Sequence, residues 1–323
     1  MNRFKPIRLY SVAGQRSSGA PRIGIVAVGS PAGAMLYRLA GKFPDLYRAI
    51  EIDTQGEDAS AYGVCADQTI LIGEEREKPA LASQARAMAA AHDATIEEAL
   101  KPFDLVFILA GMGGATGSGV APLVAASAKR AGVLAVGVAI TPFAFEGAQR
   151  IANALSGVED FRQSIDTVFT LDNERLFQGA NEGVTQQIDA TFLSLYCTIS
   201  QSFHGGGVVG GDFEDVQEVF YKTGRAAMGF GTGSGDDRIK QSVMRAIEHP
   251  LLGSDALARA TGVLVLIRSG EGHLKVKDAA EVNNLVMAHT SPDGYLNYMA
   301  NVDPALGKAF AVSILATGIP NHD

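Results

Sequence analysis

The sequence predicts an α/β protein in which a domain with a mostly parallel sheet is followed by a connecting helix and a smaller α+β domain. Three observations predict this class. Short apolar runs alternate with helical stretches over the first half of the chain, which is typical of a parallel sheet covered on both faces. A glycine-rich segment lies between one predicted strand and the next helix. The length of 323 residues exceeds what one ordinary core needs, so two domains are expected.

The individual elements follow from apolar runs and from helical periodicity. In the first half, strands are predicted at 23–28, 47–52, 69–72, 104–110 and 133–141, and helices at 34–40, 82–100 and 120–131. In the second half, helices are predicted at 183–203, 215–223 and 237–248, and strands at 262–267, 296–299 and 310–316. The predicted divisions are a mobile N-terminal arm at 1–21, a first domain at 22–180, the central helix at 181–205, a second domain at 206–319 and a short tail at 320–323.

Composition excludes several classes of function. The formal net charge of −8 argues against a nucleic-acid partner, because phosphate neutralisation needs clustered Lys and Arg. The two cysteines, Cys65 and Cys197, form no CxxC pattern, and no His or Cys cluster has metal-ligand spacing, so reduced structural thiols are expected. No apolar run has the length of a membrane span, so we expect a cytoplasmic protein.

The glycine-rich segment is the strongest local signal. It contains Gly113, Gly114, Ala115, Thr116, Gly117, Ser118 and Gly119. A helix N-terminus offers unpaired N–H groups, and glycines let the backbone approach a bound phosphate. The alternative is a flexible tight turn. The segment is not a Walker loop, and the chain has no GxGxxG, which argues against a dinucleotide-dependent oxidoreductase.

Several further motifs follow the glycine-rich segment in a fixed order. They are Thr141 to Gly147 (TPFAFEG), Arg150, Asp172 to Leu176 (DNERL), Asp212 to Val216 (DFEDV), Ala227 to Gly231 (AMGFG) and Ser234 to Arg238 (SGDDR). In this order and spacing, from about Ile23 to Ile319, the chain resembles FtsZ of the tubulin/FtsZ GTPase superfamily.

The resemblance implies a divergent FtsZ-like cytoskeletal protein, with a Rossmann-like GTPase domain, a central connecting helix and a smaller α+β C-terminal domain. The first domain would bind GTP or GDP with Mg²⁺, and subunits would stack head to tail into filaments with the nucleotide between them. The second domain would complete the site of the neighbouring subunit, so that slow GTP hydrolysis is expected. The alternative is a non-enzymatic filament or scaffold protein of the same fold, in which the nucleotide is purely structural or absent.

The resemblance assigns several nucleotide contacts. Residues 113–119 match the phosphate loop, with Ala115 where the signature has glycine, and the methyl group fits if this residue has a negative φ. Glu146 and Arg150 match a pair that contacts ribose and phosphate; the alternative is an exposed i, i+4 ion pair. Asn173 matches a guanine-contacting asparagine; the alternative is a turn or a helix N-cap.

Other parts of the site depart from the family pattern. The first loop contains Gly29, Ser30, Pro31, Gly33 and Ala34 in place of a glycine run that ends in asparagine. Pro31 removes a backbone donor and Ala34 lacks a side-chain amide, so weaker nucleotide contacts are expected there.

Two further departures concern the γ-phosphate and the base. The γ-phosphate-sensing third loop is not recognisable at 73–79. In the central helix, Ala190 stands where the family has a guanine-binding aspartate. The adjacent Asp189 can serve only if the register shifts by one residue.

Two acids in the second domain carry the expected catalysis. Asp212 and Asp215 match residues that, in FtsZ, reach the neighbour's nucleotide and polarise the attacking water. The alternative is that acids gather at a helix N-terminus because its dipole favours them. Gly210 replaces a family asparagine, which is one reason to expect slow hydrolysis.

The expected partner is a second copy of the chain. Residues 320–323 lack the terminal peptide by which FtsZ recruits division adaptors, so those adaptors are not expected as partners. Recruitment to a membrane would use a partner protein or the N-terminal arm.

Overall fold

The computed structural model describes residues 21–42, 48–54, 66–73, 79–177, 183–201, 213–221 and 223–320. The chain divides into two compact units, residues 1–190 and 191–323, and each is described by itself. The division falls inside the long helix α8 (Val184–Gln201), which the sequence predicts at 183–203. Most of the predicted arm and tail lies outside the described residues, and the predicted domain bounds stay a prediction.

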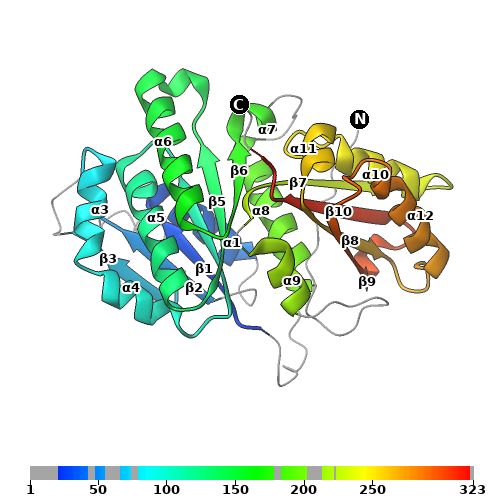
Figure 1. The fold of residues 1–323 in the computed structure, drawn as a ribbon, viewed down its shortest axis with the longest axis horizontal. Coiled ribbons are helices and arrows are strands. Elements are labelled where there is room, and N and C mark those ends of the chain that lie inside the picture. Colours follow the sequence, from blue (N-terminus) through cyan, green and yellow to red (C-terminus); the bar gives the residue numbers. More distant parts are fainter. Residues whose placement is uncertain are drawn as a thin grey trace. The chain divides into compact units, whose positions relative to one another are not determined.

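A six-strand parallel arrangement forms the centre of unit 1 (Figure 1). The strands occur in the order β3-β2-β1-β4-β5-β6, and every neighbouring pair is parallel. The apolar side chains of β1 from Ile25 to Val28 and of β4 from Leu105 to Ala110 are fully buried, as expected for strands with both faces covered. The predicted α/β class with a mostly parallel sheet is therefore confirmed. The bounds are β1 (Ile23–Val28), β2 (Arg48–Asp53), β3 (Gln68–Leu71), β4 (Leu105–Gly111), β5 (Leu134–Thr141) and β6 (Thr167–Asp172).

Helices cover this sheet, and α5 is central among those on the near face in Figure 1, where it packs against α3, α4 and α6. The predicted helices at 34–40 and 120–131 begin earlier, because α1 starts at Ser30 and α5 at Ala115. Neither α6 nor β6 is among the predicted elements. The bounds are α1 (Ser30–Lys42), α3 (Ala82–Ala90), α4 (Asp93–Leu100), α5 (Ala115–Arg130), a 3₁₀ turn η1 (Ala144–Glu146), α6 (Ala148–Ser164) and α7 (Asn173–Phe177).

The single helix predicted at 82–100 is wrong, since two helices, α3 and α4, occupy this range. Between them, the N–H groups of Ala91 and His92 donate to the carbonyls of Met88 and Ala89 at 3.3 and 2.9 Å. These three-residue turns close α3, and Asp93 then starts α4 where a helix N-terminus favours an acid.

Unit 2 is a smaller α+β arrangement. Its strands occur in the order β7-β10-β8-β9, with β10 antiparallel to β7 and β8, and β9 parallel to β8. Apolar side chains of β8, β10, α10 and α12 form its core. Over the described part of the chain, none of the helices is both long and apolar enough to cross a bilayer. The bounds are α9 (Phe213–Phe220), β7 (Gly224–Gly233), α10 (Arg238–Ile247), α11 (Ser254–Arg259), β8 (Gly262–Ser269), α12 (Val276–Met287), β9 (Tyr295–Val302), η2 (Pro304–Leu306) and β10 (Phe310–Thr317).

Candidate functional site

The strand order of unit 1 locates its candidate site. The order reverses between β1 and β4, because the connection from β1 leads to β2 on one side and β4 lies on the other. In open parallel sheets, ligands bind at such a switch point, outside the carboxyl ends of the strands. Both strands end there in glycine-rich turns, and α1 and α5 begin directly after them. The predicted phosphate loop and the predicted first loop therefore lie at the same edge.

The backbone of the phosphate loop forms the start of α5. Gly113 has a φ of +93°, a left-handed conformation that favours glycine, and its N–H donates to Oγ of Ser118 at 2.9 Å. Gly114 is extended and precedes the first helical residue, Ala115. In helix geometry, the first N–H groups have no intrahelical acceptor, so the backbone from Ala115 to Gly117 presents donors at the positive end of the dipole.

The alanine in this loop is compatible with the fold. Ala115 is the first residue of α5, and a right-handed helix has a negative φ, so the condition stated for its methyl group is met. At Gly113 a side chain is not tolerated, because a Cβ atom would lie 2.8 Å from the carbonyl oxygen of Arg150. At Gly114 a Cβ atom would meet nothing within 4 Å. The space in front of Gly114 is thus open.

A cavity of about 240 Å³ lies beside this loop. Its lining includes Gly114, the α6 residues Asn153 and Ser156, and residues 79–82 at the start of α3. Amide, hydroxyl and backbone groups therefore line a space that is continuous with the α5 N-terminus, and so does Asp160, whose carboxylate pairs with Arg86 at 2.7 Å.

Most of the predicted first loop belongs to helix α1, which was predicted to begin only at residue 34. Gly29 has a φ of +81°, and α1 starts immediately afterwards at Ser30. Pro31 and Gly33 thus lie in the first turn of α1, and Ala34 follows them in the helix. Proline is tolerated in a first turn because the missing N–H has no intrahelical partner there. Pro31 therefore removes one N–H group that could donate to a ligand, and it leaves helix α1 intact.

Two residues that the sequence reasoning did not assign join the two loops. Thr54 Oγ1 lies 3.3 Å from Thr116 Oγ1 of α5, and Asp53 Oδ2 accepts from Ser30 Oγ at 2.9 Å. Asp53 is buried, and burial, together with the charge of Asp53, raises the pKa of nearby Glu51. The sequence could have indicated Asp53 and Thr54, because they come at the end of a predicted buried strand and so lie at this edge of the sheet.

Glu146 and Arg150 form an ion pair after β5. Nε of Arg150 lies 3.1 Å from Oε2 of Glu146, and Oε1 of Glu146 accepts from the N–H of Phe143 at 2.8 Å. This is the i, i+4 pair of the alternative interpretation. Arg150 also contacts the phosphate loop, since its backbone packs on Gly113. The pair therefore lies beside the loop, and its two interpretations are compatible.

Asn173 follows β6 at the same edge of the sheet. It is 8% exposed, and its Oδ1 has no hydrogen-bond partner within the described ranges. The helix N-cap role belongs to Asp172, whose Oδ1 accepts from the N–H of Glu174 at 2.9 Å. An unpaired buried amide oxygen is costly unless a ligand or water supplies a donor.

Asp189 has a partner that the sequence did not suggest. Arg38 Nε donates to Oδ2 of Asp189 at 2.9 Å, and Arg38 Nη2 donates to Oδ1 at 2.8 Å. The aspartate is buried, and the neighbouring Ala190 is exposed. Both carboxylate oxygens are thus engaged within unit 1. No local pattern links these residues, because 151 positions separate them.

The predicted catalytic acids belong to unit 2. Asp215 lies in the first turn of α9, which starts at Phe213, so its helix-start interpretation stays open. Asp212 lies outside the described residues. Through the described ranges of both units, no three His, Cys, Asp or Glu side chains gather closely enough to hold a metal ion.

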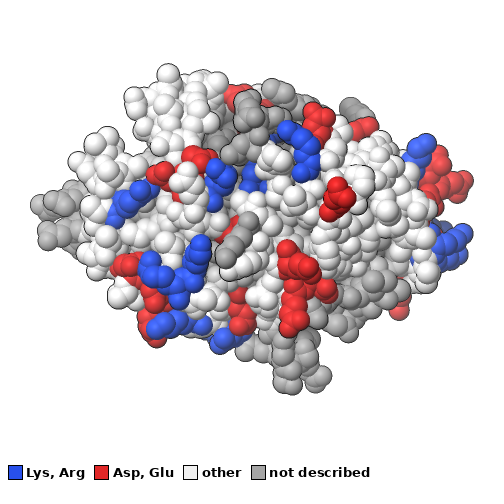
Figure 2. All heavy atoms as spheres, in the orientation of Figure 1, with Lys and Arg blue, Asp and Glu red and all other residues white. Residues whose placement is uncertain are grey.

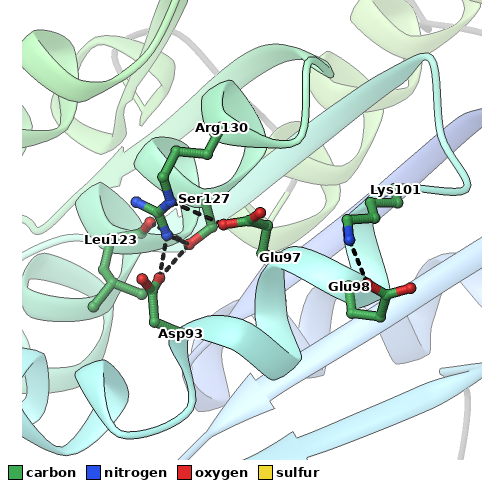
Figure 3. Close-up of polar contacts among 7 residues, drawn as sticks. All are labelled: Asp93, Glu97, Glu98, Lys101, Leu123, Ser127 and Arg130. Carbon is green, nitrogen blue, oxygen red and sulfur yellow. Dashed lines mark hydrogen bonds and ion pairs between the residues drawn. The ribbon is translucent and has the colours of Figure 1, made fainter.

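Ion pairs and hydrogen bonds link the C-terminal end of α5 to α4 (Figure 3). Nε of Arg130 lies 2.9 Å from Oε2 of Glu97, and Ser127 Oγ donates to Asp93 Oδ1 at 2.7 Å. The hydrogen bond from Ser127, followed by the interactions with Arg130, lowers the pKa of Asp93. Figure 2 shows basic and acidic side chains next to one another over this part of unit 1. Cations at its C-terminus suit the dipole of a helix whose N-terminus forms the phosphate loop.

Fold and site together define the class: an α/β protein with Rossmann-like strand order and a glycine loop at a helix N-terminus. A model of the Tubulin/FtsZ family, GTPase domain, matches residues 42–181, and a model of the FtsZ family, C-terminal domain, matches residues 224–320. The chain belongs to the tubulin/FtsZ family, and the resemblance based on the motifs is confirmed.

Individual relatives agree with this assignment. Cell division protein FtsZ of Bartonella bacilliformis is 37% identical over 238 residues, which are 71% of this chain and 40% of the relative. FtsZ of Rhizobium radiobacter is 32% identical over 309 residues, 93% of this chain and 52% of the relative. The chain thus spans about half the length of the relatives it matches. The solved structure of an empty FtsZ dimer of M. jannaschii matches with a TM-score of 0.79 at 28% identity. The match covers 92% of this chain and 88% of the FtsZ chain.

Proposed function

We propose that this chain binds guanine nucleotide, GTP or GDP with Mg²⁺, at the switch point of unit 1. The observation that carries the proposal is the glycine loop that leads directly into α5 between the ends of β1 and β4. Such an N-terminus binds phosphate through backbone N–H groups and needs no cationic side chain. Membership in a family whose first domain is described as a GTPase domain supports the choice of nucleotide.

Each part of the edge has a role in this proposal. The N–H groups from Ala115 to Gly117 and the Thr116 hydroxyl hold the phosphates, and the first turn of α1, with Gly29, Ser30, Gly33 and Ala34, flanks them. Glu146 and Arg150 contact ribose and phosphate. Asn173 meets the base, and this contact would give its buried Oδ1 the missing donor. Bound Mg²⁺ neutralises phosphate charge.

Subunits stack head to tail with this edge against the next copy. Two exposed aromatic side chains support the contact of this edge with another subunit: Phe145 is 82% exposed and Phe177 is 55% exposed. Phe143 stacks on Phe145 at 4.9 Å between ring centroids and meets Phe177 edge-on. Clustered apolar side chains at a surface mark an interaction site. The solved FtsZ relative described as a dimer supports self-association of this fold.

Hydrolysis is completed in trans and is slow. Asp212 and Asp215 of one subunit orient and deprotonate the water that attacks the nucleotide held by the next subunit. The filament serves as a cytoskeletal element in division or membrane remodelling, in line with relatives described as cell division proteins. The protein works in the cytoplasm and reaches a membrane through a partner protein or the N-terminal arm.

GTP turnover measured against protein concentration, with sedimentation in parallel, tests this proposal. Activity per molecule should rise with concentration, because only subunits with a neighbour have a complete site. Turnover that is strictly proportional to protein concentration would contradict completion in trans.

The second candidate is a filament or scaffold protein that does not hydrolyse nucleotide. Two features of α8 favour it: Ala190 stands at the position of the family's base-contacting aspartate, and the adjacent Asp189 already pairs with Arg38. Filaments that form equally well without nucleotide, together with undetectable turnover, would support this candidate.

A further inference from the structure

A cavity of about 490 Å³ lies in unit 2, where helices α10 and α12 begin. Its lining comes from three segments that are distant in sequence: the turn that leads into α10, the start of α12, and the turn between η2 and β10. Lys275 and Lys277 line it from the second segment and Lys308 from the third, and all three residues are exposed. The proposed nucleotide site belongs to unit 1, so this cavity is a separate feature of the molecule.

Arg238, the first residue of α10, holds the three segments together. Its Nη1 donates to the carbonyl of Lys308 at 2.9 Å, and its Nη2 donates to the carbonyl of His273, two residues before Lys275, at 3.0 Å. The guanidinium also lies over the ring of Phe310, 5.8 Å from the ring centroid. The backbone that carries the lysines is therefore fixed before any ligand binds, and such preorganisation lowers the entropic cost of binding.

The carboxylates of the lining differ in how far their charge is compensated. Asp278 is buried, and its Oδ2 accepts from the N–H of Lys275 at 3.2 Å and lies 3.6 Å from Nη2 of Arg238. Its charge is thus compensated by Arg238 and by the positive end of α12. Asp236 and Glu281 are exposed, and they oppose the three lysines. Three lysines against two exposed carboxylates leave an excess of one positive charge, to which the N-terminus of α10 adds.

Backbone donors complement the ammonium groups. The residue before α10, Asp237, makes no capping hydrogen bond through its side chain in the described structure, and Ile239 of the first turn lines the cavity. The first N–H groups of a helix have no intrahelical acceptor and can donate to a ligand. A phosphate monoester carries nearly two negative charges and three acceptor oxygens. It therefore uses more of these donors than a carboxylate, which has one charge and two oxygens.

We propose that this cavity binds the phosphate group of a small anionic ligand through Lys275, Lys277, Lys308 and the start of α10. A soluble phosphate compound and a phosphomonoester lipid headgroup share this chemistry. Val276, which stands between two of the lysines and is 80% exposed, would enter the bilayer interface if a lipid supplied the phosphate. The site goes beyond the proposed nucleotide binding and does not depend on it.

Calorimetry of the full chain with inorganic pyrophosphate, at low ionic strength, tests the site. Lys277→Gln should weaken binding about two- to fivefold, the range for one exposed charge pair. Lys240→Gln is the matched control, because Lys240 is exposed on α10 outside the lining, and it should leave the affinity unchanged. Glu281→Gln should strengthen binding about two- to fivefold, because it removes an opposing charge.

Replacing Lys275, Lys277 and Lys308 together by Gln should weaken pyrophosphate binding about 10- to 100-fold. The unfolding temperature should stay the same, because the three residues are exposed. Pyrophosphate binding that is undetectable in the natural chain, or that the three substitutions leave unchanged, would overturn the inference.

The variant Gly114→Asp separates this site from the phosphate loop of unit 1. The part of pyrophosphate binding that depends on the three lysines should persist in Gly114→Asp, and the triple lysine variant should bind GTP as the natural chain does. Loss of the lysine-dependent part in Gly114→Asp would assign the anion to the phosphate loop and would overturn the inference.

Flotation with vesicles distinguishes the two sources of phosphate. With a lipid ligand, the nucleotide-free protein should float with phosphatidylcholine vesicles that contain phosphatidic acid and not with phosphatidylcholine alone. Pyrophosphate should then compete, and Val276→Ser should weaken vesicle binding but not pyrophosphate binding. With a soluble ligand, pyrophosphate binds and neither kind of vesicle carries the protein. Either result supports the site, whereas vesicle binding that survives replacement of the three lysines would overturn it.

Discussion

The phosphate side and the base side of the site are built by different means. On the phosphate side, Gly113 and Gly114 shape a loop whose donors are backbone N–H groups at the start of α5. On the proposed base side, Asn173 and Asp189 would act through side chains, and Asp189 pairs with Arg38. Backbone donors persist through changes of side chain as long as the loop keeps its shape. Side-chain contacts change with single substitutions.

The contrast explains how this chain differs from its family pattern. The phosphate loop tolerates Ala115 because the residue is helical. The base side departs more, since Ala190 is exposed and Asp189 has another partner. Phosphate binding is therefore the part of the proposed function with the firmest physical basis, and base selectivity is the part most open to change.

The largest effect is expected on turnover, because neither side of the site supplies the acid that activates water. Asp212→Ala should reduce GTP turnover by about 10²- to 10⁴-fold, the range for a positioned acid or base. Nucleotide affinity should hardly change, since the loop donors are untouched. Steady-state turnover and calorimetry measure the two quantities on the same protein.

A mixing experiment gives the control for this variant. Asp212→Ala protein combined with a phosphate-loop variant should recover some activity, because one mixed interface joins two intact halves. An Asp212→Ala protein with full activity would make the acids helix-start residues and would favour the non-enzymatic filament.

A smaller effect is expected on the base side. Asn173→Leu should weaken GTP binding about tenfold by removing the amide contacts. Its unfolding temperature should not fall, because Leu removes a buried oxygen that lacks a partner among the described residues. The reverse pattern, unchanged affinity with lower stability, would make Asn173 a structural residue.

The aromatic cluster beside the site tests assembly separately from binding. Phe145→Ser removes a ring that is 82% exposed, so the monomer should keep its stability and its GTP affinity. The concentration needed for sedimentation of filaments should rise severalfold, because the ring would otherwise be buried between subunits. Filaments that form at the normal concentration would exclude the cluster from the subunit contact.

The smallest effect is expected from the N-terminal arm. Deleting residues 1–20 should leave polymerisation and GTP affinity unchanged, because the proposed site is built from later residues. Loss of filaments in this truncation would place the arm in the subunit contact and contradict the predicted domain boundary.

The sequence predicts the shape of the loop at the start of α5 better than the surroundings of Asp189, for a physical reason. A glycine run between a strand and a helix encodes its own geometry locally, and the parallel sheet follows from apolar runs. The start of α1 at Ser30 and the break before Asp93 were missed, because periodicity does not reveal how the first or last turn is capped. The partner of Asp189 was missed because Arg38 is distant in sequence.

The most direct test is calorimetry of GTP and ATP with the natural chain and with Gly114→Asp. The natural chain should bind GTP at least about tenfold more tightly than ATP. In the variant, the new side chain enters open space and caps α5, so the unfolding temperature should stay equal or rise. Its charge faces the proposed phosphate position, so GTP binding should fall about 100-fold or more, whereas uncharged Gly114→Ser should lose much less. Equal affinity for GTP and ATP, or a Gly114→Asp protein that binds GTP normally, would contradict the account.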